Sequence, residues 1–215
     1  MIKTTTACAV SLLCFTSFAS AQVTIEYFDS GNALPPVTGG TPTSTESVSL
    51  FETTTNRADN YGSRLTSFFI PAFTANYTFG MASDDDGQVF LSTDADPANA
   101  VQIISNGGWS SVRNYTTHEG GAGVAGNFST PISLVGGQAY FIEGLHAEGG
   151  GGDNYALTAT ADLTNDPILA GRAPLGDPSM DATIGTLSNV PEPATATVAA
   201  LGLAGLMLRR RARKA

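Results

Sequence analysis

Residues 76–93 read NYTFGMASDDDGQVFLST, and this stretch contains the pattern that decides the fold. In residues 77–81, YTFGM, the large apolar side chains stand at every second position, as in a β-strand with one buried face. Residues 88–93 form a second strand-like run, and the polar sequence SDDDG separates it from the first. The stretch therefore predicts two strands joined by an acidic turn.

Similar short runs, each bounded by Gly, Pro, Asn or Asp, recur through the body of the chain. They cover residues 23–28, 48–51, 64–70, 76–82, 88–93, 101–104, 131–135, 138–145 and 155–161. Gly136 and Gly137 join two of these runs and predict a hairpin. Because no part of the body has a sustained helical period, we expect an all-β fold, an antiparallel β-sandwich or barrel, and we favour the sandwich.

Two stretches lack this pattern. Residues 107–127 predict a long surface loop, and long loops on sandwiches often carry binding. Residues 162–189 are rich in Pro, Gly, Asp and Ala, which favours a linker. The predicted sandwich therefore spans residues 22–161.

The N-terminus has the three parts of a secretory signal peptide. Lys3 precedes a mostly apolar or small-residue stretch at 7–18, and the small-x-small sequence Ala19-Ser20-Ala21 follows. This order disfavours the alternative of a buried N-terminal helix. We expect cleavage after Ala21, so residues 1–21 are excluded from the fold.

The C-terminus combines a proline motif, an apolar segment and a basic end. Pro191-Glu192-Pro193 precedes the uncharged residues 194–208, and the basic end at 209–214 begins with Arg209, Arg210 and Arg211. A helix over 194–208 is roughly 22 Å long, shorter than the roughly 30 Å hydrocarbon core of a bilayer. It suits a temporary single-pass anchor, with the arginines in the cytoplasm and the sandwich outside.

This arrangement over residues 190–215 resembles the PEP-CTERM tail that exosortases recognise. The resemblance implies an exported protein that is transiently anchored in the inner membrane and cut by an exosortase near Pro191-Glu192-Pro193. The body would then pass to the cell surface or the extracellular matrix. An ordinary tail anchor is the alternative.

The composition of residues 22–189 limits the function. Cys8 and Cys14 both lie in the predicted signal peptide, so the mature body has no disulfide and no thiolate metal site. Its only cations are four arginines against eighteen carboxylates, all of the chain's nineteen except Glu192, a net charge of −14. Such a surface repels nucleic acid and is compatible with divalent cations and neutral sugars.

Two acidic loops are candidates for a metal site. Asp84, Asp85 and Asp86 lie in the first, and Gly152, Asp153 and Asn154 end the second. Calcium prefers six to eight oxygen ligands, which two converging loops could supply. Adjacent side chains on a strand point to opposite faces, so Asp84 and Asp85 can share an ion only through an unusual backbone such as a cis peptide. A solvated turn is the alternative, and Asp94 with Asp96 offers a rival ion site.

At these residues the body resembles the PA14 domain family, named after bacterial protective antigen. The matching stretches are 60–64 (NYGSR), 77–79 (YTF), 83–93 (SDDDGQVFLST), 137–143 (GQAYFIE) and 149–154 (GGGGDN). The resemblance implies a β-sandwich over about residues 23–160 that in several members binds glycans through calcium held by paired aspartates. It implies Asp84 and Asp85 as the paired ligands, with Asp153 and Asn154 from the second loop. The third aspartate, Asp86, departs from the family pattern.

Three further residues are candidates for ligand binding: Asp86, Gly152 and Trp109, the only tryptophan, whose ring could stack on a sugar or anchor its loop. His146 begins the sequence His-Ala-Glu, which lacks the spacing of a zinc helix motif, and we interpret it as a strand-end residue. No nucleophile elbow or phosphate loop occurs, so we expect a non-catalytic protein. The hypotheses are a calcium-dependent module that binds an extracellular glycan or exopolysaccharide, and a structural or assembly component of the matrix that binds none.

Overall fold

The computed structural model describes residues 23–29, 31–35, 40–117, 119, 127–164, 167–180 and 182–185. The predicted signal peptide and sorting tail lie outside these residues. Within the described ranges, none of the helical structure is long and apolar enough to cross a membrane. The regular elements there are ten β-strands and one 3₁₀ turn, η1 (Pro97–Asn99), so the all-β prediction is confirmed.

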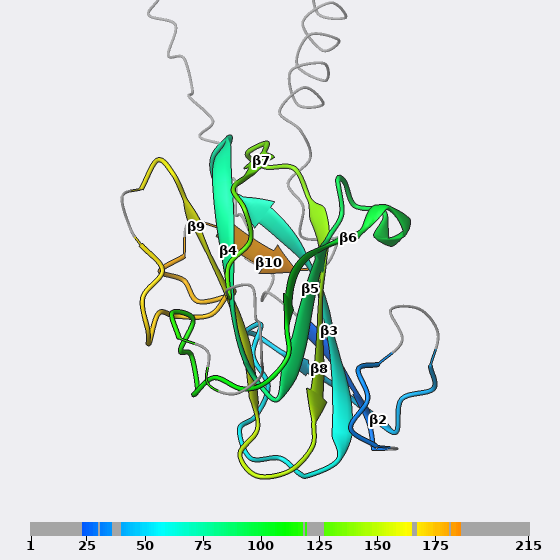
Figure 1. Cartoon of the computed structure of the whole chain (residues 1–215). Helices are drawn as coiled ribbons and strands as arrows, with labels where there is room; N and C mark the ends of the chain where they lie inside the picture. The colour runs from blue at the N-terminus through cyan, green and yellow to red at the C-terminus, as the bar shows by residue number, and fades with distance from the viewer. Residues whose placement is uncertain are drawn as a thin grey trace, which may run out of the picture.

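The strands form two antiparallel sheets that face each other (Figure 1). The larger sheet has the order β2-β1-β3-β8-β5-β6, with β10 also paired to β3. Its members are β1 (Val23–Phe28), β2 (Ser44–Val48), β3 (Tyr61–Pro71), β5 (Asp86–Leu91), β6 (Val101–Asn106), β8 (Tyr140–Glu148) and β10 (Ala182–Gly185). The smaller sheet has the order β7-β4-β9, from β7 (Ile132–Leu134), β4 (Ala75–Asp84) and β9 (Asn154–Ala161).

The main core lies between the two sheets. The alternation in residues 77–81 is confirmed, because Tyr77, Phe79 and Met81 of β4 are all buried in it. Phe69 of β3 packs edge-on against Tyr77 and Phe79, with ring centroids 5.4 and 5.0 Å apart. Edge-to-face aromatic contacts of this kind add to the burial energy and fix the spacing of the sheets.

The glycine pair at 136–137 does not make the predicted hairpin. Gly137 has a φ of 77° and turns the chain, but the strands on its two sides lie in different sheets. β7 pairs with β4, whereas β8 pairs with β3 and β5. The two glycines therefore carry the chain from one sheet to the other.

The prediction of a linker at 162–189 is wrong for much of this segment. Leu175 is fully buried, and its backbone N–H donates to Leu157 O at 2.8 Å. Ile184 of β10 is also buried in the main core. The segment packs because these isolated apolar side chains cover the sheet, although they recur without a regular period.

A second, smaller core covers the outer face of the smaller sheet. It consists of Ala82, Tyr115, Ala156 and Ile168. The small side chains come from β4 and β9, while Tyr115 and Ile168 come from the segments that follow β6 and β9. This packing holds the 107–117 segment against β4, next to the acidic turn.

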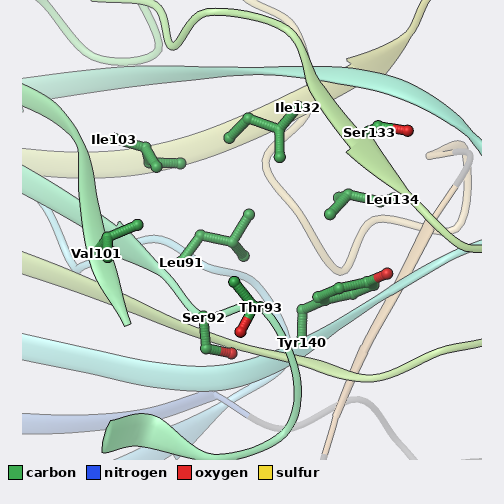
Figure 2. A pocket seen from close by; sticks show the side chains of 9 residues that line it. All are labelled: Leu91, Ser92, Thr93, Val101, Ile103, Ile132, Ser133, Leu134 and Tyr140. Carbon is green, nitrogen blue, oxygen red and sulfur yellow. The ribbon is translucent and has the colours of Figure 1, made fainter. Parts of the chain in front are cut away.

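A cavity of about 190 Å³ lies at the opposite end of the sandwich from that turn. Figure 2 shows its lining, which is mostly apolar: Leu91, Ser92, Thr93, Val101, Ile103, Ile132, Ser133, Leu134 and Tyr140. Leu91 ends β5, whereas Asp86 begins it. The cavity is therefore remote from the acidic turn, and no charged group lines it.

Candidate metal centre

The acidic turn connects the smaller sheet to the larger one. Asp84 ends β4, Asp86 begins β5, and Asp85 stands between them. The Asp84–Asp85 peptide bond is cis, which is the kind of backbone that shared ligation by adjacent aspartates requires. Both side chains are partly exposed. The turn therefore offers two carboxylates at the surface of one end of the sandwich.

Glu148 joins these two aspartates. One carboxylate oxygen from each of Asp84, Asp85 and Glu148 lies within 4.8 Å of the others. Glu148 ends β8 and is fully buried, so it approaches from the interior. The sequence analysis missed this residue. Its position at the end of a strand, directly before the glycine run at 149–152, is the signal that could have found it.

Several buried oxygens at this end of the sandwich have no hydrogen-bond partner. They include both carboxylate oxygens of Glu148, Oδ1 of Asp153 and Oδ1 of Asn154, together with the hydroxyl oxygens of Tyr61 and Ser83. Each unpartnered buried polar atom costs about 1–3 kcal/mol, more when charged. A cation would satisfy such oxygens, so the residues present fit a metal ion with oxygen ligands.

The raised pKa values of Asp84 and Glu148 also favour a cation at this site. Burial, with added repulsion from Asp85 and Asp153, raises the pKa of Asp84 to about 6. Burial also raises the pKa of Glu148 to about 7, and the charges of Asp85, Asp84 and Asp153 add to the effect. The carboxylates thus repel one another, and a bound cation would relieve the repulsion.

The second predicted loop comes beside the first, as the sequence analysis expects. Asn154 lies opposite Asp84 in the β4–β9 pairing, and its Nδ2 donates to Ser110 O at 2.9 Å. Asp153 Oδ2 accepts from Ala58 N at 3.0 Å. Asp153 stands outside the three-carboxylate group, although its charge reaches both Asp84 and Glu148. The protein thus orients Asn154 through its Nδ2 and Asp153 through its Oδ2, and the Oδ1 of each residue remains without a hydrogen-bond partner.

His146 supports the turn from inside the core. Its Nε2 lies 2.6 Å from Asp84 O, and its Nδ1 lies 3.3 Å from Ser63 Oγ. Burial lowers the pKa of His146, so the neutral ring donates from Nε2 to the Asp84 carbonyl and accepts at Nδ1. The ring also packs against Tyr61 and Tyr155. His146 therefore holds the turn in place.

The glycine run lets the second loop approach the carboxylates. Gly149 N donates to Asp85 Oδ2 at 3.0 Å, and a Cβ on Gly149 would lie 3.0 Å from that same oxygen. A Cβ on Gly152 would lie 3.5 Å from Asp84 Oδ2. A Cβ at Gly149 would press against the Asp85 carboxylate, whereas one at Gly152 would make only ordinary van der Waals contact. Gly152 itself can contribute only backbone to a ligand.

Asp86 and Trp109 stand beside the centre. Asp86 Oδ1 accepts from Gly108 N at 2.9 Å, so this carboxylate fixes the neighbouring loop and does not join the three-carboxylate group. Trp109 pairs its backbone with Glu119, through bonds of 2.9 and 2.7 Å. The residue is 38% exposed, so its ring is not buried as a core anchor. Ser110 N donates to Ser83 O at 2.7 Å, which ties this loop to β4.

The rival pair Asp94 and Asp96 is satisfied by its own neighbours. Asp94 accepts from Asn99 Nδ2 and Asp96 N, and Asp96 Oδ1 accepts from Ala98 N at the start of η1. These bonds are those of a capped turn. The two carboxylates therefore stabilise this turn, and both oxygens of Asp94 already accept hydrogen bonds within it.

Comparison with known structures supports the fold. The epithelial adhesin 9 A domain from Candida glabrata, solved with Galβ1-3GlcNAc, is 10% identical with a TM-score of 0.51, covering 80% of this chain and 93% of its own. The epithelial adhesin 6 A domain from the same organism is 9% identical with a TM-score of 0.50, and the match covers 80% of this chain and 89% of the adhesin domain. A PA14 sugar-binding domain from an RTX adhesin is 12% identical with a TM-score of 0.49, and the match covers 73% of this chain and 99% of that domain.

The chain spans about half the length of two further matched structures, both anti-sigma factor domain-containing proteins, of which it covers 47% and 52%. No curated protein sequence matches the chain. The expected PEP-CTERM tail is confirmed as a sequence motif, because residues 189–211 match the PEP-CTERM protein-sorting motif. The chain is therefore an exported protein that carries this sorting motif, and its body is a β-sandwich with the fold of the adhesin A domains, as the resemblance to the PA14 family predicts.

Proposed function

We propose that this chain is a calcium-dependent carbohydrate-binding module of the cell surface or the extracellular matrix. The observation that carries the proposal is the set of buried oxygens without partners around the cis Asp84–Asp85 pair. Carboxylates and an amide oxygen, with no nitrogen or sulfur ligand among them, are the donors that calcium prefers.

Asp84, Asp85 and Glu148, whose carboxylates already lie together, would hold the ion, and Asp153 and Asn154 would add the unpartnered oxygens that stand beside them. Glu148 is buried, whereas Asp84 and Asp85 are partly exposed. The protein therefore encloses the ion from the core side and leaves the solvent side open. When bound, calcium supplies coordination positions that two hydroxyl groups of a sugar can fill.

The surroundings of the open side suit a neutral sugar. The glycine run at 149–152 places no side chain over the carboxylates, and the exposed Trp109 ring stands on the neighbouring loop. An apolar ring face beside polar groups is the usual combination for binding a pyranose. The adhesin 9 A domain, which shares the fold, was solved in complex with Galβ1-3GlcNAc, and this supports a carbohydrate ligand here. Binding without catalysis is the activity that this arrangement favours.

Localisation follows from the sorting motif. An exosortase would cut the chain near Pro191-Glu192-Pro193 after transient anchoring by residues 194–208, and the sandwich would then reach the surface or the matrix. There it would meet extracellular glycan or exopolysaccharide, at calcium concentrations that suit a surface site of modest affinity.

The test is calorimetric titration of the exported protein with calcium, followed by binding to immobilised neutral disaccharides, beginning with Galβ1-3GlcNAc. We expect saturable calcium binding that Asp84→Asn with Asp85→Asn abolishes. The matched control, Asp94→Asn with Asp96→Asn, removes two carboxylates from the satisfied turn and should leave binding unchanged. If the folded wild-type protein takes up no calcium, the metal site is wrong. If calcium binds but no sugar does, a structural matrix component becomes the better interpretation.

A further inference from the structure

The apolar cavity lies on the side of the sandwich where both sheets end. β6 is an edge strand of the larger sheet, and β7 is an edge strand of the smaller one. Among the described residues, neither strand pairs with another strand on its outer side. Residues of both strands line the cavity. The core is therefore open between the two edges, and the cavity of about 190 Å³ occupies the opening.

Aliphatic side chains from both sheets form the walls of this cavity. Leu91 and Leu134 are buried members of the main core, while Ile103 and Ile132 are partly buried and pack against that core. Figure 2 shows Leu91, Ile132 and Leu134 pointing toward one another across the cavity. An occupant would therefore extend the apolar packing of the core.

The polar atoms of the buried lining residues are engaged by the protein. Ser92 Oγ donates to Asp94 O and accepts from Phe141 N at 2.9 Å. The Tyr140 hydroxyl accepts from Val135 N at 2.8 Å. A water molecule in a cavity needs about two to four polar partners, so this lining holds water poorly. The same lack of partners disfavours a sugar, and the cavity favours an apolar occupant.

The mouth of the cavity carries no charge. Val101, at the start of β6, is 59% exposed although it lines the cavity. Thr93 and Ser133 are also exposed, and no charged residue is among the lining residues. An ion would lose hydration here without gaining a partner of opposite charge. The ligand that suits this site is therefore uncharged.

The volume and the edge of β6 limit what can bind. Pockets for drug-sized ligands have roughly 300–1,000 Å³. An engineered apolar cavity of about 150 Å³ binds benzene, and the present one is only slightly larger. The β5–β6 register shifts at Ile103, which is an extra residue in β6. A bulge of this kind bends an edge strand and discourages the addition of another strand, which favours a small molecule over a peptide.

We propose that this cavity is a second ligand site, which takes a small uncharged apolar molecule the size of a benzene ring. Leu91 lies at the far end of β5 from Asp86, so the site is separate from the metal centre. It uses no residue of that centre and stands apart from the proposed function. The chain thus offers a polar site at one end of the sandwich and an apolar site at the other.

The test uses toluene as the probe and follows methyl NMR signals of the exported protein. Chelator is present throughout, so that the result does not depend on the metal centre. We expect saturable shifts of the signals of Leu91, Ile103 and Leu134. The signals of Leu163 and Leu169, which are 67% and 60% exposed outside the cavity, should not move. Benzoate, which adds a carboxylate to a ring of the same size, should give no shifts.

Val101→Phe should abolish toluene binding, because the larger side chain fills the mouth of the cavity. Since Val101 is mostly exposed, this substitution leaves the main core intact. The matched control is Val112→Phe. Val112 is 52% exposed and does not line the cavity, so this variant should bind toluene as the wild type does.

Four results would overturn the proposal. The folded wild-type protein could show no saturable shifts with toluene. Benzoate could bind as well as toluene, which would contradict an uncharged apolar site. The signals of Leu163 and Leu169 could shift together with those of the cavity, which would indicate adsorption to the surface. Finally, the two phenylalanine variants could bind toluene equally, which would place the ligand elsewhere.

Discussion

Glu148→Gln should make the calcium-free protein more stable at neutral pH and weaken its response to calcium. The raised pKa of Glu148 sets the direction. An acid whose pKa is higher in the folded state than in the unfolded state opposes folding at any pH above the unfolded value. For Glu148 this penalty begins near pH 4.5 and grows until the pH passes about 7. Glutamine keeps the shape of the side chain and removes the charge.

The size of the effect follows from that shift. One pKa unit corresponds to about 1.4 kcal/mol, so a rise from 4.5 to about 7 sets an upper limit of about 3 kcal/mol. The neighbouring aspartates are partly exposed, and water beside them screens part of the repulsion. We therefore expect Glu148→Gln to stabilise the calcium-free protein by about 1–2 kcal/mol at pH 7.5 and by little at pH 5.

The assay is urea denaturation in chelator at pH 5 and pH 7.5, repeated with calcium at pH 7.5. The matched control is Glu143→Gln. Glu143 is also buried, and its pKa is also raised to about 7, chiefly by burial, but its nearest ionic partner is Arg64 at 3.8 Å. Glu143→Gln should therefore change the pH dependence and leave the calcium response intact.

Saturating calcium should stabilise the wild-type protein by about 3 kcal/mol at one hundred times the dissociation constant, and much less in Glu148→Gln at the same concentration. The reasoning is refuted if Glu148→Gln leaves both the pH profile and the calcium response as in the wild type. It is also refuted if both glutamine variants lose the calcium response equally.

The remaining predictions concern four other residues. His146→Phe should lower stability by about 1–3 kcal/mol, because the Asp84 carbonyl loses its buried donor, and should weaken calcium binding in the same titration. Gly149→Ala should weaken calcium binding severalfold, since its Cβ would lie 3.0 Å from Asp85 Oδ2, while Gly150→Ala, whose Cβ would meet only Asp59 at an ordinary 3.9 Å, is the control. Leu175→Ala should cost about 2–5 kcal/mol in urea denaturation, whereas a residue of a loose linker would cost nothing. Trp109→Ala should reduce disaccharide binding and leave the calcium isotherm unchanged; equal loss of both would contradict its stacking role.

The sequence predicted the elements whose side chains alternate. β1 has the expected bounds of residues 23–28, and in β4 the apolar residues at 77, 79 and 81 point into the core. β10 was not predicted, because four residues are too few to show a period. Its pairing partner, β3, is also far away in the chain, so no local pattern indicates the strand. The turn at residues 136–137 was recognisable as a turn, but turn residues do not reveal which sheet the next strand joins.

The candidate site was predictable to a similar extent. Asp84 and Asp85 were found because two adjacent aspartates in a turn are visible in one line of sequence. Glu148 was not found, because an acid at the end of a strand becomes a ligand candidate only when that strand ends beside the turn. Burial without a partner is a property of the packed structure, and no local pattern reports it.

The position of the centre explains why an ion would matter to this fold in particular. The chain passes between the two sheets at the β4–β5 turn and again between β8 and β9. Asp84 and Asp85 lie on the first crossing, and Glu148, Asp153 and Asn154 flank the second. Both cysteines belong to the predicted signal peptide, so no disulfide can join the two crossings in the mature body. An ion held by residues of both crossings would tie the sheets together at this end, and it would do so with the same carboxylates that repel one another in its absence.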